Sequence, residues 1–144
     1  MIVPVAMSCV RVGVDIVEVR RVASCIERWG DRFLRRIFTE QELRRCAGRP
    51  ASLAARFAAK EAVAKALGVG IGAVAWREVE ILNLENGEPA VLLHGRAEAV
   101  AALLGATCTA LSLSHSREHA VAVAVLCCRP QPAGPDAYIK EVHS

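Results

Sequence analysis

Apolar and polar residues follow two different periods along this chain, and each period predicts a different kind of element. Val10, Val12 and Val14 alternate with other residues, which is typical of a strand. From about Val17 to Trp29 the apolar residues return every three or four positions, which predicts a helix. The segment Thr39 to Glu42 has the form of a capping box and predicts a short helix with Thr39 as its N-cap.

The middle of the chain predicts a longer helix followed by a hairpin. The Ala-rich run from Arg56 to Leu67 favours a helix, and the glycine-rich segment from Gly68 to Gly72 would end it in a turn. Alternation from Trp76 to Leu84 predicts a strand. Asn86-Gly87 is typical of a hairpin turn, and Ala90 to His94 would be the return strand.

The last third of the chain predicts one more helix and two strands. The helix would run from about Arg96 to Leu104. The strands would cover Cys108 to Ser114 and His119 to Leu126, with a turn at Ser116 to Glu118. Helices that precede and separate antiparallel strands define an α+β fold.

The chain is long enough for one compact domain. It has 144 residues, of which 53% are hydrophobic. We place the domain at residues 10–128. Residues 1–9 would then be an N-terminal extension, and residues 129–144, rich in proline and polar residues, a flexible tail.

The composition favours a cytoplasmic protein that does not enter a membrane. No apolar run approaches the length that spans a bilayer, and the apolar N-terminus contains Pro4 and lacks the basic residues of a signal peptide. The six cysteines include no Cys-X-X-Cys pair. We therefore expect reduced, mostly buried thiols and no zinc site or disulfide framework.

The net charge of +3 is unevenly distributed. Residues 20–49 contain nine arginines and four acidic residues. Such a basic segment suits an acidic protein partner or a polyphosphate ligand, although a solvated helix face would look the same. Nucleic acid is less favoured, because aromatic residues make up 4% of the chain and leave little for base stacking.

Two acidic residues far apart in the sequence form the candidate reactive site. Asp15 stands at the end of the first predicted strand, where Gly13 allows close backbone approach or a bulge. Glu61 lies in the Ala-rich helix, and three cations surround it within about one and a half turns: Arg56, Lys60 and Lys65. Two carboxylates completed by phosphate oxygens and water commonly hold Mg²⁺.

Both acidic residues have a simpler explanation. Glu61 and Lys65 are four residues apart, so they could form an ordinary ion pair on a helix surface. Asp15 could cap the helix that follows the strand. The spacing alone leaves these alternatives open.

Taken together, the motifs resemble one protein family. The segments GVDIVEVRR and RFAAKEAVAKALG are similar to the holo-acyl-carrier-protein synthase family of 4′-phosphopantetheinyl transferases. The resemblance continues in family order to about residue 127, through FTEQEL, GVGIG, NGEP and SLSHSREHAVAVAV.

This resemblance implies an α+β enzyme of fatty acid biosynthesis that forms a homotrimer with sites at its subunit interfaces. The enzyme would use Mg²⁺ to transfer the 4′-phosphopantetheine arm of coenzyme A to a serine of an apo acyl carrier protein. Adenosine 3′,5′-bisphosphate would be released. The last two predicted strands, rich in Ala and Val, are consistent with burial on both faces in such an assembly.

The resemblance also assigns roles to individual residues. Asp15 and Glu61 would bind the metal, and with Lys65, which would contact the phosphates, they are the candidate catalytic residues. Glu61, or a water that it orients, would accept the serine proton. Eight residues would bind coenzyme A: Arg56, Lys60, Lys65, Gly68, Gly87, Pro89, His115 and Ser116. Arg21 and Arg28, nearly on one helix face, would dock the acidic carrier protein.

Other interpretations of the same residues stay open at this point. His115 could simply face solvent at a strand end, and a metal pair of His115 with His119 would lack a third ligand. Turn geometry alone explains Gly87 and Pro89. For the whole chain, the alternatives are a non-catalytic module that binds coenzyme A or a nucleotide, and a basic nucleic-acid-binding domain.

Overall fold

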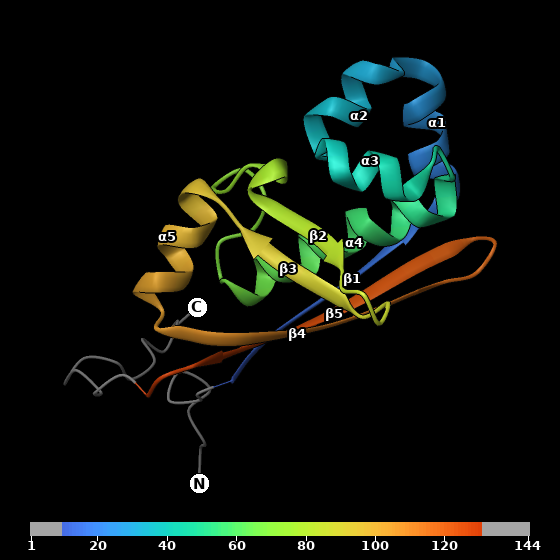
Figure 1. The fold of residues 1–144 in the computed structure, drawn as a ribbon. Helices are drawn as coiled ribbons and strands as arrows, with labels where there is room; N and C mark the ends of the chain where they lie inside the picture. The colour runs from blue at the N-terminus through green and yellow to red at the C-terminus, as the bar shows by residue number, and fades with distance from the viewer. Residues whose placement is uncertain (1–9, 131–144) are drawn as a thin grey trace, which may run out of the picture.

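A computed structural model of the chain describes residues 10–130, and Figure 1 shows how its helices and strands are interleaved. The predicted extension over residues 1–9 lies outside the described residues, as does the predicted tail from residue 131 onward. Within the described range, helices and two antiparallel sheets alternate along the chain, which confirms the α+β fold.

The main sheet brings the two ends of the described chain together. Strand β1 (Val10–Glu18) pairs antiparallel with β5 (His119–Cys128), and β5 pairs antiparallel with β4 (Ala106–His115). In this register Asp15 lies opposite Ala122. Asp15 is therefore in the interior of a strand, not at its end as the sequence predicted, and the pairing of β1 with β5 fixes its position.

Helix α4 (Pro50–Ala66) covers one face of this sheet and forms the centre of the core. Its buried alanines let the helix approach β1 closely. A Cβ atom on Gly13 would lie only 1.8 Å from the carbonyl oxygen of Ala62. Of the two interpretations of Gly13, close backbone approach is the one that the structure confirms.

The opposite face of the main sheet is apolar, and no element within residues 10–130 covers it. β1 contributes Val12, Val14 and Ile16, which are 55–66% exposed. β5 contributes Val121 and Val123 to the same face, because Ile16 pairs with Val121 and Val14 with Val123. Burial of β4 and β5 on both faces, which the sequence suggested, therefore does not occur within the described part of one chain.

The remaining elements lie around α4. Helices α1 (Val19–Trp29), α2 (Asp31–Ile37) and α3 (Glu40–Cys46) form one cluster beside α4 (Figure 1). A 3₁₀ turn, η2 (Trp76–Glu78), leads into the hairpin of β2 (Val79–Asn83) and β3 (Pro89–Leu93). Helix α5 (Gly95–Leu103) connects this hairpin to β4.

The predicted elements are present, with differences at their ends. β1 continues to Glu18, so the first helix begins at Val19 and not near Val17. α4 begins at Pro50, a residue favoured in the first turn of a helix, several residues before the predicted start. α2 was not predicted; it follows Gly30, whose positive φ of 52° ends α1 and redirects the chain.

Candidate active site

Asp15, Glu61 and Lys65 meet where β1 lies against α4. The Lys65 ammonium donates to Asp15 Oδ1 at 3.0 Å and to the Val14 carbonyl oxygen at 2.9 Å. Burial raises the pKa of Glu61, the negative charge of Asp15 raises it further, and Lys65 opposes both. The two carboxylates, 46 positions apart in sequence, are thus close enough for the charge of Asp15 to act on Glu61.

This geometry decides between the alternatives for both acids. Asp15 is not a helix cap, because Glu18 is the N-cap residue of α1 and no side chain caps that helix. A simple surface pair of Glu61 with Lys65 is also insufficient, because the Lys65 ammonium forms its ion pair with Asp15 across the two elements. The three residues form one cluster of two carboxylates and one cation.

The cluster fits a substrate-completed magnesium site better than a closed metal cage. Carboxylate oxygens are the ligands that Mg²⁺ prefers, and one or two are usual when phosphates supply the rest. Among residues 10–130, no group of three or more His, Cys, Asp or Glu side chains could hold a metal by itself.

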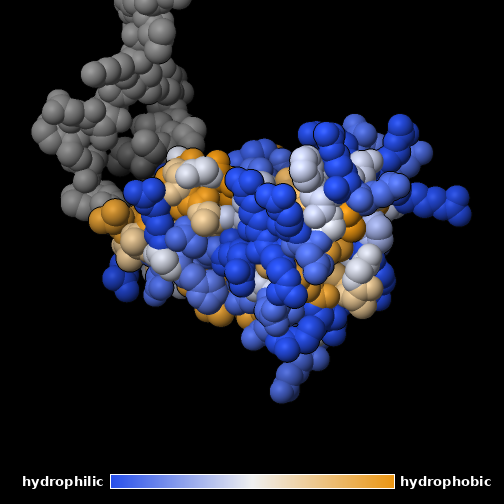
Figure 2. Space-filling model, turned by 90° about the horizontal axis from the view of Figure 1, so that it is seen from above, coloured by the Kyte–Doolittle hydropathy of each residue, from blue (hydrophilic) through white to orange (hydrophobic). Residues whose placement is uncertain are grey.

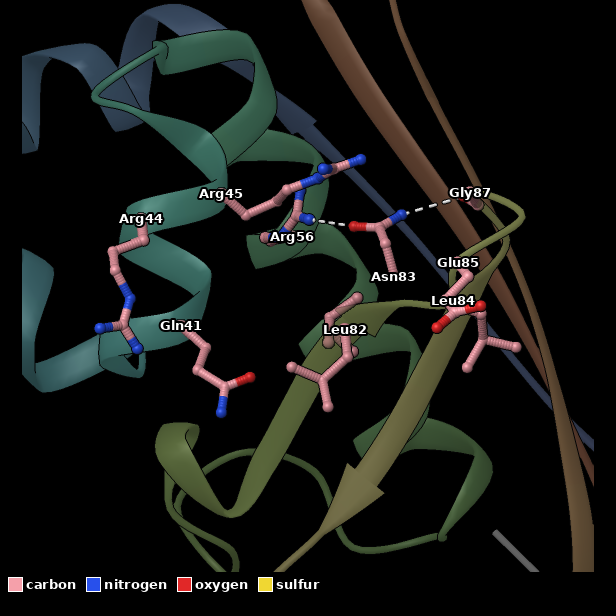
Figure 3. Close-up of a pocket in the computed structure, with 10 residues that line it drawn as sticks. Gln41, Arg44, Arg45, Arg56, Leu82, Asn83, Leu84, Glu85 and Gly87 are labelled. Carbon is pink, nitrogen blue, oxygen red and sulfur yellow. Dashed lines mark hydrogen bonds between the residues drawn. The ribbon is translucent and has the colours of Figure 1, made fainter.

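A basic cavity opens between α3 and the β2–β3 turn, beside Arg56 of α4 (Figure 3). It has a volume of about 660 Å³, and a smaller cavity of about 210 Å³ adjoins it at Arg56, Asn83 and Gly87. Pro89 and the β4 residues 111–113 line the smaller one. Three arginines contribute to the larger one: Arg44, Arg45 and Arg56.

Arg56 is the buried cation of this cavity. The residue is only 7% exposed, and its Nη2 donates to Asn83 Oδ1 at 2.6 Å. Its Nε is buried and has no hydrogen-bond partner in the described part of the chain. Because a buried donor without a partner is costly, Arg56 is a strong candidate for binding an anionic ligand.

The prediction that Lys60 contacts phosphate needs correction. Lys60 is fully buried, and its ammonium donates to Glu42 Oε1 at 2.7 Å and to the carbonyl oxygens of Val79 and Trp76 at 2.7 and 3.1 Å. An ammonium has three protons, and all three are used. Burial lowers the pKa of Lys60, while the Glu42 carboxylate opposes that shift. Lys60 therefore belongs to the core.

Glu42 does more than the predicted capping box requires. The box itself is confirmed, with Thr39 and Glu42 each accepting from the other's backbone N–H. Glu42 also accepts from Lys60 and from the Ile81 backbone N–H at 3.1 Å. One buried carboxylate thus joins α3, α4 and β2, which form the walls of the basic cavity.

The other predicted coenzyme-binding residues are divided between two places. Gly87 and Pro89 line the smaller cavity beside Arg56. His115 and Ser116 are exposed at the β4–β5 turn and line neither cavity. The Ser116 hydroxyl accepts from the Glu118 and His119 backbone N–H groups, so it has a structural role in that turn.

Gly68 lies beyond the end of α4. A Cβ atom there would meet the Arg11 guanidinium, which donates to the Ala66 carbonyl oxygen at 2.7 Å. Arg11 therefore caps the C-terminus of the helix that carries Glu61 and Lys65. Gly68 makes room for that cap, and neither cavity around Arg56 includes it.

Arg21 and Arg28 are exposed on α1, as predicted. The view onto the helices in Figure 2 is mainly hydrophilic. The Arg28 guanidinium lies 4.9 Å from the ring centre of Trp29, which is itself 50% exposed. A surface that combines cations with an exposed aromatic ring is suited to a protein partner.

Five polar or charged residues of the basic cavity were not among the sequence candidates: Gln41, Arg44, Arg45, Asn83 and Glu85. The two arginines belong to the basic segment that the charge analysis identified, but their position in the segment gave no sign of a cavity. Asn83 had no sequence signal, because its partner Arg56 is 27 positions away.

Comparisons with known proteins agree with this fold. Residues 11–124 match the 4′-phosphopantetheinyl transferase superfamily. A holo-[acyl-carrier-protein] synthase of Herpetosiphon aurantiacus is 49% identical over 120 residues, which cover 78% of this chain and 94% of that protein.

Crystal structures of two further synthases have the same fold. The Helicobacter pylori enzyme, in complex with coenzyme A, gives a TM-score of 0.74 at 31% identity and covers 80% of this chain and 98% of its own. The Neisseria meningitidis enzyme gives a TM-score of 0.73 at 35% identity. The match covers 81% of this chain and 96% of that enzyme's chain.

The chain therefore belongs to the 4′-phosphopantetheinyl transferase superfamily. The resemblance found in the sequence is confirmed, and so is the prediction of a transferase enzyme. Within residues 10–130, no helix has both the length and the apolar character needed to cross a membrane.

Proposed function

We propose that this chain is a holo-acyl-carrier-protein synthase. It transfers 4′-phosphopantetheine from coenzyme A to a serine of an apo acyl carrier protein and releases adenosine 3′,5′-bisphosphate. The observation that carries the proposal is the meeting of Asp15 and Glu61 beside Lys65, in a chain similar to proteins of that name.

In the proposed reaction the serine oxygen attacks the phosphorus that carries the pantetheine arm. The bond from that phosphorus to the bridging oxygen of the diphosphate breaks, and the nucleotide leaves with that oxygen. Lys65, half exposed beside Asp15, supports the proposed binding of the diphosphate. Such transfers depend mainly on positioning and charge neutralisation, which a basic group next to the diphosphate provides.

Asp15 and Glu61 would hold Mg²⁺, which when bound neutralises charge on the diphosphate. The raised pKa of Glu61 also favours it as the group that receives the serine proton, directly or through a water that it orients. Either role requires the carboxylate to remain where Gly13 allows β1 and α4 to meet.

The basic cavity is the proposed site for the nucleotide end of coenzyme A. Arg56 offers a buried cation with an unused Nε, and Gly87 and Pro89 form the adjoining wall. The Helicobacter pylori structure contains coenzyme A, which supports a coenzyme site in this fold. Lys60 has no part in it, because its three donors are used in the core.

We also propose that the active form is a homotrimer. The uncovered apolar face of β1 and β5 supports this, since monomers rarely expose contiguous apolar surface of this kind. In such an assembly the exposed β4–β5 turn, with His115 and Ser116, would be available to a neighbouring copy. The surface of α1 around Arg21 and Arg28 is the proposed docking site for the acidic carrier.

The decisive experiment incubates the full-length protein with apo acyl carrier protein, coenzyme A and Mg²⁺, and measures the carrier by mass spectrometry. We expect the carrier to gain one phosphopantetheine group. Asp15→Asn and Glu61→Gln should each lower the rate on the order of 10²–10⁴-fold. Glu98→Gln on the exposed surface of α5 is the control and should leave the rate unchanged.

Two other results would favour the alternatives. Binding of coenzyme A without modification of any of several carriers would indicate a non-catalytic binding module. Salt-dependent binding of DNA or RNA that ignores coenzyme A would indicate a nucleic-acid-binding domain. In both cases the transferase proposal would be wrong.

A further inference from the structure

Asn83 connects the buried cation of the basic cavity to the β2–β3 turn. It is the last residue of β2 and pairs with Pro89 at the start of β3. Its Oδ1 accepts from Arg56 Nη2 at 2.6 Å, and its Nδ2 donates to the Gly87 carbonyl oxygen at 3.1 Å. Figure 3 shows this chain of two hydrogen bonds along the edge of the cavity.

The orientation of the Asn83 amide follows from its partners. A guanidinium only donates hydrogen bonds, and a backbone carbonyl oxygen only accepts them. The oxygen of the amide must therefore face Arg56, and its nitrogen must face Gly87. No other orientation satisfies both neighbours, so the side chain fixes the guanidinium and the turn relative to each other.

The partner of Arg56 is neutral, and this matters for an anion site. Among residues 10–130, Arg56 forms no ion pair with a carboxylate. An amide oxygen positions the guanidinium without cancelling its charge, whereas a carboxylate in the same place would neutralise it. Together with the unpartnered Nε, this leaves a buried and oriented positive charge that no carboxylate pairs with directly, although the exposed Glu85 lines the same cavity.

We propose that Asn83 is a positioning residue for coenzyme A binding. It orients Arg56 toward a phosphate group at the nucleotide end and holds the β2–β3 turn against that group through Gly87. This inference rests on the proposed function and adds a specific residue to it. It requires a neutral side chain at position 83 that both accepts and donates a hydrogen bond.

The test compares Asn83→Asp with Asn86→Asp in the full-length protein. Asn86 lies in the same exposed turn, where its side chain accepts from the Glu88 backbone N–H. Both substitutions add one negative charge to the turn. Only Asn83→Asp neutralises Arg56 and turns the donor to Gly87 into an acceptor.

Calorimetric titrations with coenzyme A and with adenosine 3′,5′-bisphosphate supply a readout that is independent of turnover. We expect Asn83→Asp to weaken the binding of both ligands about 10- to 100-fold, and Asn86→Asp to change it about twofold or less. In steady-state assays the KM for coenzyme A should rise by a similar factor, while kcat and the KM for the carrier change little.

Asn83→Leu is the second variant, because it keeps a similar side-chain size, adds no charge and removes both hydrogen bonds. It should weaken coenzyme A binding several-fold. If Asn83→Asp does not fold, Asn83→Leu replaces it in the binding measurements. Unchanged binding in both Asn83 variants, or equal losses in Asn83→Asp and Asn86→Asp, would overturn the inference. If the unmodified protein itself neither binds coenzyme A nor modifies a carrier, the proposed function fails instead.

Discussion

The backbone of Gly13 in β1 lies against the carbonyl oxygen of Ala62 in α4, so closely that a Cβ atom would approach it to 1.8 Å. Ala62 is the residue after Glu61, and Asp15 is two residues after Gly13. The close approach of one backbone to another therefore brings the two carboxylates of the site together. Any side chain at position 13 must separate β1 from α4 or distort one of them.

Gly13→Ala should consequently impair both stability and activity. Overpacking of this kind typically costs about 1–3 kcal/mol of the free energy of unfolding. We expect a lower melting temperature and loss of carrier modification beyond the unfolded fraction. Gly48→Ala is the control: Gly48 has a φ of 71° and open space around its Cβ position. It should cost about 1 kcal/mol and leave the rate of the folded protein intact.

Lys60 and Lys65 should respond in opposite ways to replacement by Met. Lys60→Met leaves the Glu42 carboxylate buried without its ion-pair partner, a change that typically costs about 3–5 kcal/mol of stability. Lys65→Met removes a half-exposed pair worth about 0–1 kcal/mol but should abolish most activity. Denaturant unfolding and the carrier assay separate the two effects. A stable and active Lys60→Met variant would contradict the buried-core role.

Glu61 should make the metal-free protein less stable as the pH rises. Its pKa is raised in the folded state, so between the ordinary glutamate value and the raised value the folded state binds more protons than the unfolded state. Stability is therefore lost as pH increases through that window.

Glu61→Gln removes this titration and should raise the melting temperature at neutral pH, with no gain at low pH. Added Mg²⁺ should raise the melting temperature of the unmodified protein and not that of the variant. If Mg²⁺ stabilises both proteins equally, the assignment of Glu61 as a metal ligand is wrong.

The apolar outer face of the sheet should control oligomeric state. Val14→Asp or Val123→Asp places a charge where we propose that copies meet, and should convert the trimer to monomers in sedimentation analysis. Leu92→Asp, on an exposed position of β3 away from this face, is the matched control and should sediment as the unmodified protein does. A monomeric unmodified protein with full activity would contradict the trimer proposal.

Substitutions on the basic surface of α1 should weaken the binding of the carrier and leave the binding of coenzyme A unchanged. Arg21→Glu and Arg28→Glu reverse charges that would meet the acidic carrier, so the KM for the carrier should rise while the KM for coenzyme A is unchanged. The effect should shrink at high salt, because these side chains are exposed. Arg77→Glu, exposed on η2, supplies the control for a general change in net charge.

Local signals in the sequence predicted most of the elements, because each signal acts over a few residues. The capping box at Thr39, the Asn86-Gly87 turn and the alternating valines of β1 all lie where expected. α2 escaped prediction because its start depends on the backbone of Gly30 and its short length leaves little periodicity.

Side-chain roles were harder to predict where they depend on distant partners. Lys60 and Lys65 are both lysines on one helix, and the family resemblance implied that both bind the coenzyme. One faces a buried carboxylate 18 positions earlier in the chain, and the other faces Asp15 on β1. Only the rotation of α4 against its neighbours separates them, and that rotation follows from packing over the whole domain.

The pairing of β1 with β5 has a consequence for how the enzyme is made in the cell. Asp15 leaves the ribosome well before the strand that holds it in register, because its partner Ala122 is 107 residues further along the chain. A nascent chain that stops before His119 lacks that strand entirely. Termination before β5 should therefore yield fragments that consume no coenzyme A, and catalytic competence should arise only once translation has passed β5.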